Sequence, residues 1–233
     1  MLESYMRNRL SHDYISVYDD VNSHASLAGQ MLKKSHLLLE KTLPIRPANQ
    51  HVLEVGAGTG HHYEFVDKNK IATYVITDIS DSALKTISEK YQKEAQQQSI
   101  VIKQADALAL DAFNDKEFDR VIATHVLEHI PTPIDALKEW TRVLKQGGIL
   151  SLVLPCDPGM LWRLGRYFGP RRAAVKAGLL DYDYIMAIEH VNPIFNLYQI
   201  INYHFDEIYD VWWPCRIALP DINLFYICHI INK

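Results

Sequence analysis

Short apolar runs alternate with longer stretches of helical periodicity through the middle of the chain. The apolar runs are rich in Val, Ile and Leu and predict buried strands at 51–55, 73–77, 100–103, 118–124 and 149–154. Between them, 80–95 and 133–144 have helical spacing, and Gly147 and Gly148 are expected to end the second of these helices. Strands that alternate with helices predict parallel strands, with crossover helices on both faces of one sheet.

The pattern differs at the two ends of the chain. Residues 27–43 place apolar residues at helical spacing before Pro44, which predicts one helix. Near the C-terminus, 193–205 predicts a helix, whereas 207–213 and 224–231 predict two strands close enough to pair antiparallel. The expected fold is therefore a doubly wound α/β sheet, mostly parallel, that finishes with a reversed hairpin.

Composition and charge narrow the class of protein. A length of 233 residues fits one domain, and 48% hydrophobic with 22% charged residues is typical of a globular protein. The net charge of −4 disfavours a nucleic-acid partner but leaves room for a local basic patch. No segment predicts a signal sequence or a membrane span, and the three cysteines lack metal-ligand spacing. We expect a soluble cytoplasmic protein with reduced thiols and no metal.

A glycine-rich turn follows the first predicted strand. The sequence Leu-Glu-Val-Gly-Ala-Gly-Thr-Gly at 53–60 predicts a strand, a turn with Gly56, Gly58 and Gly60, and then a helix. Glycine lets the backbone turn sharply and approach a ligand closely, although a tight turn without a ligand is the simpler alternative. The dinucleotide pattern G-x-G-x-x-G requires glycine where this chain has His61, so an NAD-dependent oxidoreductase is the weaker hypothesis.

Polar residues also follow the next three predicted strands. Asp78 lies 24 residues after Glu54, where a carboxylate accepts hydrogen bonds from both hydroxyls of a ribose. Asp106 follows the third strand and is able to accept from an exocyclic amine such as that of adenine. Thr124 and His125 end the fourth strand at the same edge. A helix cap at Asp78 and a turn at Asp106 are the structural alternatives.

On these residues the chain resembles the class I S-adenosylmethionine-dependent methyltransferases, in particular the type 11 small-molecule group. Val-Leu-Glu-His-Ile at 126–130 and Leu-Lys-Gln-Gly-Gly at 144–148 carry the same resemblance, which covers about residues 50–155. It implies a seven-stranded sheet with its last strand antiparallel. It also implies S-adenosylmethionine as the methyl donor and S-adenosylhomocysteine as the product.

The resemblance implies a place for each part of the cofactor. The turn, with Ala57, lies under the methionine moiety, Asp78 and Ile79 meet the ribose side, and Asp106 and Ala107 meet the adenine. Thr124 or His125 lies near the sulfonium. Glu54 either holds the turn through backbone amides or reaches the ammonium group of the cofactor.

The implied reaction is direct in-line methyl transfer to an oxygen, nitrogen or carbon atom of a small molecule. The alternatives are the oxidoreductase and a non-catalytic protein that binds S-adenosylmethionine. A nucleic-acid methyltransferase is disfavoured further because Thr-His-Val-Leu at 124–127 stands where enzymes that methylate exocyclic amines have Asn/Asp-Pro-Pro-aromatic. The oligomeric state stays open.

Residues 156–192 follow the fifth strand, where long insertions lie beside ligands, and we expect them to form an acceptor-side lid. Residues 1–47 are expected to form an N-terminal helical cap on the same domain, which spans 1–233. The spacing of residues early in this lid predicts a helix with an apolar stripe at Leu161, Leu164 and Phe168. Its opposite, solvated face carries Arg163 and Arg166. Two alternatives are contact with anionic lipid and a site for an anionic group of the acceptor, made of Arg163, Arg166, Arg171, Arg172 and Tyr182.

His190, near the end of the lid, is the candidate general base, because a neutral imidazole accepts a proton from an oxygen or nitrogen acceptor. A buried hinge residue is the alternative. Glu128 and His129 are expected to be structural rather than metal ligands, because Pro131 and Pro133 stop their segment. Cys156 is expected to be an inert thiol. Tyr14 and Tyr18 are either core residues or close over the cofactor.

Overall fold

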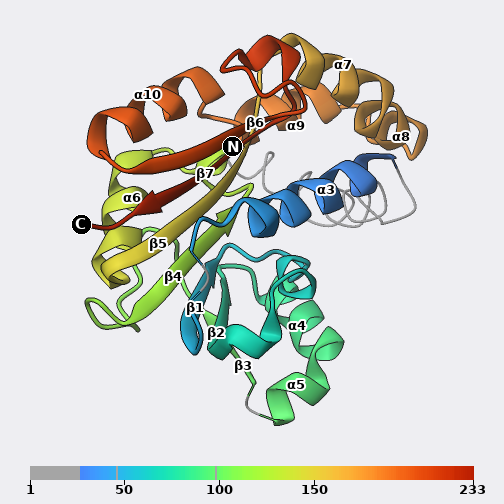
Figure 1. The fold of residues 1–233 in the computed structure, drawn as a ribbon. Helices are drawn as coiled ribbons and strands as arrows, with labels where there is room; N and C mark the ends of the chain where they lie inside the picture. The colour runs from blue at the N-terminus through green and yellow to red at the C-terminus, as the bar shows by residue number, and fades with distance from the viewer. Residues whose placement is uncertain (1–26, 46, 98) are drawn as a thin grey trace.

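A computed structural model of the chain describes residues 27–45, 47–97 and 99–233 (Figure 1). Tyr14, Tyr18 and most of the predicted N-terminal cap at 1–47 lie outside these residues. Seven strands form one sheet in the order β3-β2-β1-β4-β5-β7-β6. Their bounds are β1 Gln50–Val55, β2 Ile71–Asp78, β3 Ile100–Gln104, β4 Phe118–Thr124, β5 Leu144–Pro155, β6 Ile208–Trp213 and β7 Phe225–Ile231. The first five are parallel, and β7 pairs antiparallel with both β5 and β6. The predicted fold class is confirmed.

Helices cover both faces of the sheet (Figure 1). Alternate residues along β1 point to opposite faces, so Val52 packs in one core with α3 (Leu27–Thr42) and α4 (Asp81–Lys90). Leu53 packs in the other core with α6 (Pro133–Val143) and α10 (Ile194–His204). The remaining helices are α5 Gln92–Gln96, α7 Met160–Phe168, α8 Pro170–Lys176 and α9 Tyr182–Glu189. None of the described helices is long and apolar enough to cross a membrane.

The prediction of a helix directly after the glycine turn is wrong. Between β1 and β2 the described chain has only two short 3₁₀ turns, η1 His62–Glu64 and η2 Lys68–Lys70. The ring of Tyr63 packs on Tyr74 and Tyr91, and His62 donates to or accepts from groups on α3. These tertiary contacts outweigh the helical pattern, and the low helix propensity of the bulky residues in this segment acts in the same direction.

Two predicted boundaries also differ. The helix predicted over 80–95 is interrupted at Tyr91, whose hydroxyl donates to the carbonyl of Gly60 at 2.7 Å. The helix predicted over 133–144 ends at Val143, before the two glycines, because β5 already begins at Leu144. A Cβ at Gly148 would lie 2.9 Å from the Lys145 carbonyl oxygen, so this glycine is required by close backbone packing within the strand.

The predicted orientation of the lid helix α7 is wrong for three of the five predicted residues. Leu164 and Phe168 are exposed, whereas Arg166 turns inward and its Nη1 lies 3.8 Å from Asp157 Oδ2. Leu161 is half-buried and Arg163 is exposed, as predicted. The inner side is held by Trp162, whose ring meets Phe225 edge to face, and by Gly165, which faces Leu224. Large apolar residues lie on both sides of this helix, so its periodicity does not determine which side is buried.

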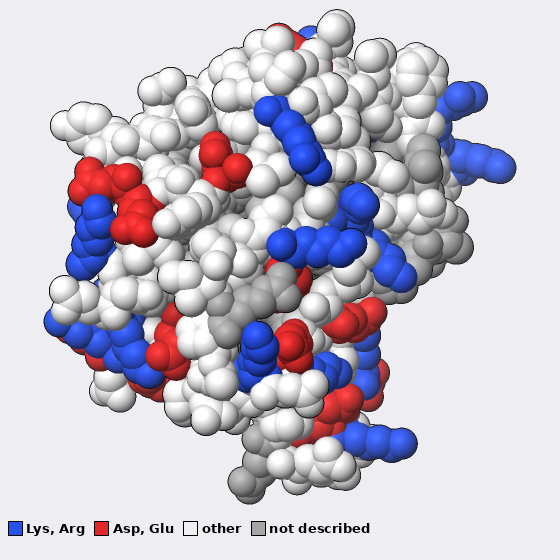
Figure 2. Space-filling view, viewed as in Figure 1, with Lys and Arg blue, Asp and Glu red and all other residues white. Residues whose placement is uncertain are grey.

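Charged side chains are distributed unevenly over the surface. Acidic and basic side chains are intermixed over the lower half of the view in Figure 2, around β1, β2 and α4. At the corner formed by α7 and α8, basic side chains project with no acidic side chain drawn beside them. The mixed charge over the rest of this view agrees with the small net charge of the chain.

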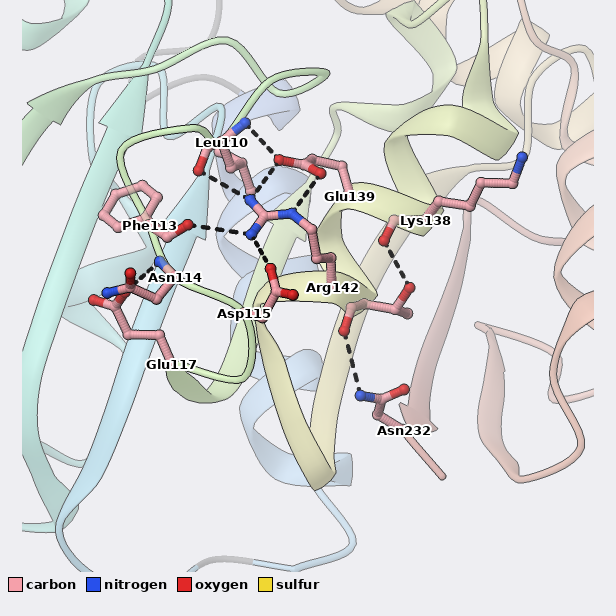
Figure 3. Close-up of polar contacts among 10 residues, drawn as sticks. Leu110, Phe113, Asn114, Asp115, Glu117, Lys138, Glu139, Arg142 and Asn232 are labelled. Atoms are coloured by element: carbon pink, nitrogen blue, oxygen red, sulfur yellow. Dashed lines mark hydrogen bonds and ion pairs between the residues drawn. The ribbon is translucent and has the colours of Figure 1, made fainter.

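Arg142 on α6 fixes the loop between β3 and β4 (Figure 3). Its guanidinium donates to the carbonyls of Leu110 and Phe113, to Asp115 at 2.6 Å, and to both carboxylate oxygens of Glu139. Glu139 in turn accepts from the backbone N–H of Leu110 at 2.8 Å. The loop that follows β3 is therefore tied to α6 by charge-assisted hydrogen bonds.

We expect Arg142→Met to lower the free energy of unfolding by about 2 kcal/mol, because two backbone carbonyls and a partly buried carboxylate lose a charged donor. Lys138→Met on the same helix is the matched control, since Lys138 is exposed and lies 3.8 Å from exposed Asp135. It should change stability by less than about 0.5 kcal/mol. Urea denaturation of both variants measures the difference, and equal losses would contradict this role of Arg142.

Candidate functional site

The glycine turn after β1 is tightly packed at its two ends and open at its centre. Gly56, Gly58 and Gly60 have φ of +64°, +56° and +70°, values that favour glycine. A Cβ at Gly56 would lie 2.7 Å from Val126, and one at Gly60 would lie 3.1 Å from Ile87, so packing requires these two glycines. A Cβ at Gly58 would meet no atom within 4 Å. The turn therefore leaves open space at Gly58, where a ligand can approach the backbone.

Asp78, at the end of β2, is bonded directly to this turn. Its Oδ2 accepts from the N–H of Gly58 at 2.8 Å, and its Oδ1 accepts from the N–H of Ser80 at 2.8 Å. The side chain of Ser80, not that of Asp78, caps α4. Each carboxylate oxygen keeps a second lone pair for a further donor such as a hydroxyl. The next residue, Ile79, is 64% exposed and offers an apolar surface beside the carboxylate.

The loop after β3 brings two more predicted residues to this edge of the sheet. Asp106 is exposed, and its Oδ1 accepts from the N–H of Leu108 at 2.8 Å, as expected of a turn residue. The carbonyl of Ala107 accepts from Trp140 Nε1 at 2.9 Å, so α6 positions it. Thr124 is buried at the end of β4. The carboxyl ends of β1 to β4 therefore share one edge.

Two of the predicted residues turn their side chains under α3. Glu54 is buried, and it accepts from the hydroxyl of Tyr74 at 2.8 Å. Burial raises the pKa of Glu54. His125 has a φ of +58°, and its Nε2 lies 3.0 Å from the hydroxyl of Ser35. Burial lowers the pKa of His125 to about 3, so its ring is neutral at ordinary pH. The structure thus gives both side chains partners within the protein.

His190 forms a hydrogen-bonded pair with Asp157. Asp157 follows the end of β5, His190 follows α9, and the distance from His190 Nδ1 to Asp157 Oδ2 is 2.8 Å. Burial alone would raise the pKa of Asp157, but the hydrogen bond from His190 and the charge of Arg166 hold it below its ordinary value. A carboxylate that holds one imidazole nitrogen fixes the ring and its tautomer, which leaves the second nitrogen for proton transfer.

Glu128 lies beside this pair with an unsatisfied oxygen. It is 2% exposed, and its Oε2 has no hydrogen-bond partner among the described residues. Its Oε1 lies 3.8 Å from His125 Nδ1 and 3.9 Å from His129 Nε2, both too long for hydrogen bonds. Burial raises the pKa of Glu128 to about 7. The ring of His129 meets that of His190 edge to face, so these groups form one cluster.

The other predicted residues of the lid have different environments. Arg171 pairs with Asp183 at 2.8 Å, whereas Arg163 and Arg172 are exposed. Tyr182 is buried in a small apolar cluster with Ala174 and Met186. Cys156 is buried, and burial raises the pKa of its thiol, as expected of an inert cysteine. In the described part of the chain, no three His, Cys, Asp or Glu side chains converge as metal ligands do.

Asp157 is the site residue that sequence reasoning missed. The rule that pointed to Asp78 and Asp106, a carboxylate just past the carboxyl end of a strand, applies equally to Asp157 after β5. Glu128 was identified in sequence, but its missing partner is visible only in three dimensions.

The comparisons with known proteins agree with this geometry. The family described as a methyltransferase domain matches residues 53–152. The chain is 29% identical to a ubiquinone/menaquinone biosynthesis C-methyltransferase of Allorhizobium ampelinum over 69% of this chain and 62% of that protein. It is 32% identical to a phosphatidylethanolamine N-methyltransferase of Cereibacter sphaeroides over 44% and 49%. The chain spans between 37% and 62% of the length of the first curated relatives it matches.

One solved structure covers nearly the whole chain. It is described as an S-adenosylmethionine-dependent methyltransferase of Thermotoga maritima, possibly a histamine N-methyltransferase. The two share 18% sequence identity with a TM-score of 0.57, over 97% of each chain. At this identity the likeness concerns the fold, which agrees with the order and direction of the seven strands.

Glu128→Gln tests the buried carboxyl through the pH dependence of stability. Between pH 4.5 and 7 the unfolded chain releases this proton while the folded chain keeps it, so rising pH penalises the folded wild type. Gln does not titrate, so the stability of the variant relative to wild type should rise by about 3 kcal/mol from pH 5 to pH 8. Urea denaturation at both pH values measures this, with the more exposed Glu189→Gln as control. A pH-independent difference would show that Glu128 ionises normally.

Proposed function

We propose that the chain is a class I S-adenosylmethionine-dependent methyltransferase that transfers a methyl group from S-adenosylmethionine to a small-molecule acceptor. The observation that carries the proposal is the open turn at Gly58, whose N–H is bonded to Asp78 at the shared edge of β1 and β2. A nucleotide-like ligand binds at such an edge in open α/β sheets.

The residues at this edge fit the parts of the cofactor. The open turn at Gly58 admits the methionine moiety, and the remaining lone pairs of Asp78 accept from the ribose hydroxyls. Ile79 and Ala107 offer surfaces to the adenine ring, and Asp106 accepts from its exocyclic amine. The methyltransferase relatives favour this ligand over NAD.

Bound S-adenosylmethionine supplies a methyl group that is already activated on a sulfonium. The protein therefore has to align the acceptor, exclude water and, for an oxygen or nitrogen acceptor, remove a proton. We assign the last role to His190, which Asp157 orients at 2.8 Å. We propose that Glu128, whose pKa burial raises to about 7, donates a hydrogen bond to the acceptor in its protonated form.

We propose that 156–192 is the lid over the acceptor, because Asp157 and His190 lie at its two ends. Arg166, 3.8 Å from Asp157, is our candidate to contact an anionic group on the acceptor. The names of the relatives include a C-methyltransferase and an N-methyltransferase, so they leave the acceptor atom open. Three free cysteines support a reducing, cytoplasmic location.

Gly58→Ala is expected to weaken the binding of S-adenosylhomocysteine at least about tenfold, because the added methyl group fills the space that the ligand needs. Gly147→Ala is the matched control: its φ is +75° and an added Cβ also meets no atom within 4 Å. Both substitutions should cost about 1–2 kcal/mol of stability through the positive φ, but only the first should change binding. Calorimetric titration of the two variants and the wild type measures the affinity.

The same calorimetric titration is made with the Asp78→Ala variant, and the wild type is also titrated with NAD. Loss of two charge-assisted hydrogen bonds should raise the dissociation constant of S-adenosylhomocysteine by more than about a hundredfold. Absence of binding to folded wild type would overturn the methyltransferase proposal. Heat released with NAD instead would favour the oxidoreductase.

His190→Asn is expected to lower turnover by about 10²–10⁴-fold while the affinity for S-adenosylhomocysteine stays the same. The acceptor can be found by incubating the wild type with a small-molecule extract and a donor that carries a deuterated methyl group, followed by mass spectrometry. His204→Asn at the end of α10 is the control. Full turnover by His190→Asn would exclude the general-base role, and no labelled product from the wild type would favour a non-catalytic binding protein.

A further inference from the structure

The outer side of α7 is apolar where a solvated helix would be polar. Met160, Leu164, Tyr167 and Phe168 follow the spacing of one helical face and are 58%, 48%, 52% and 62% exposed. Farther along the lid, Leu180 is 78% exposed. Single exposed apolar residues are ordinary, but a continuous stripe of them marks a surface that binds something.

Basic residues are interleaved with this stripe. The stretch 158–180 contains five Arg and Lys and no Asp or Glu, in a chain whose net charge is −4. Arg166 and Arg171 have acidic partners in Asp157 and Asp183. Arg163, Arg172 and Lys176 form no ion pair within the described residues and are exposed. Within the described residues their charge is therefore uncompensated.

We propose that this lid surface, made of Met160, Arg163, Leu164, Tyr167, Phe168 and Arg172, docks on an anionic lipid bilayer. A short amphipathic helix binds a bilayer when its apolar side chains reach the acyl boundary and its basic side chains meet lipid phosphates. Long Arg and Lys side chains beside an apolar stripe are suited to that interface, because the stem lies in the apolar layer and the charge lies in the headgroups.

Charge and shape favour a bilayer over other partners. A nucleic acid would use the three basic residues but would leave Leu164 and Phe168 in water. The inner side of α7 carries Arg166, which contacts Asp157 of the pair with His190. Docking would thus place the lid of the proposed acceptor site against the membrane. Binding to the bilayer itself does not depend on the methyltransferase proposal.

The test is sedimentation of the full chain with vesicles of phosphatidylcholine alone or mixed with an equal part of phosphatidylglycerol. We expect binding to the mixed vesicles, weaker binding at high salt, and none to phosphatidylcholine. Replacing Arg163, Arg172 and Lys176 together by Gln should weaken binding about a hundredfold. The control replaces three exposed lysines elsewhere, Lys85, Lys93 and Lys138, and should have a much smaller effect.

A second pair of variants tests the apolar part. Leu164→Ser with Phe168→Ser should abolish binding, whereas Tyr203→Ser with Ile217→Ser, also at exposed positions, should not. Unchanged urea midpoints show that the variants fold, and this check is independent of cofactor binding. No binding of the wild type to mixed vesicles would overturn the proposal. Binding to duplex DNA that depends only on the basic residues would also overturn it. So would a dimer, seen by sedimentation equilibrium, that dissociates when Leu164→Ser and Phe168→Ser are introduced.

Discussion

Parallel pairing of β1 with β2 and β4 constrains where the chain can place polar groups. Each crossover must return the chain to the same end of the sheet, so the residues after each of the five parallel strands β1 to β5 meet at one edge. Helices bury both faces, which makes the strands almost continuously apolar. The directions of the strands therefore bring Gly58, Asp78 and Asp157 to this edge, where we propose that the ligands bind.

One polar network interrupts the apolar core and fixes α3 on the sheet. Arg120 on β4 donates to Glu40 on α3 at 2.9 Å, and His62 lies 3.0 Å from the same oxygen. Burial alone would raise the pKa of Glu40, but Arg120 and His62 lower it to about 2. The network therefore contributes stability above about pH 4.5 that is lost as the pH falls towards 2. Because His62 belongs to η1, the same network holds the chain that follows the glycine turn.

Features that depend on residues close together in the sequence could be predicted from it. The strands and the glycine turn depend on residues within a few positions of one another, and most strands were predicted to within two residues at their ends. The exception is β5, which begins at Leu144 and not at the predicted 149. The helix after the turn was wrong because His62 is held by Glu40 on another element. The pair of Asp157 and His190 joins residues 33 positions apart, so no local pattern reveals it. The side of α7 that is buried depends on Phe225 and Leu224, far along the chain.

Several buried polar atoms of the described residues have no hydrogen-bond partner, and two features that depart from the rules of stable folding lie near Asp157 and His190. Glu128 is a buried carboxyl with an unsatisfied oxygen, and α7 turns its apolar stripe to the solvent. Each costs stability, and natural proteins keep such costs mainly where function requires them. Both features lie on the side of Asp157 and His190, whereas the residues around Gly58 and Asp78 have satisfied backbone partners. The part of the edge that we propose to hold the cofactor therefore obeys the general rules of folding. These two departures lie on the side that we propose to meet the acceptor.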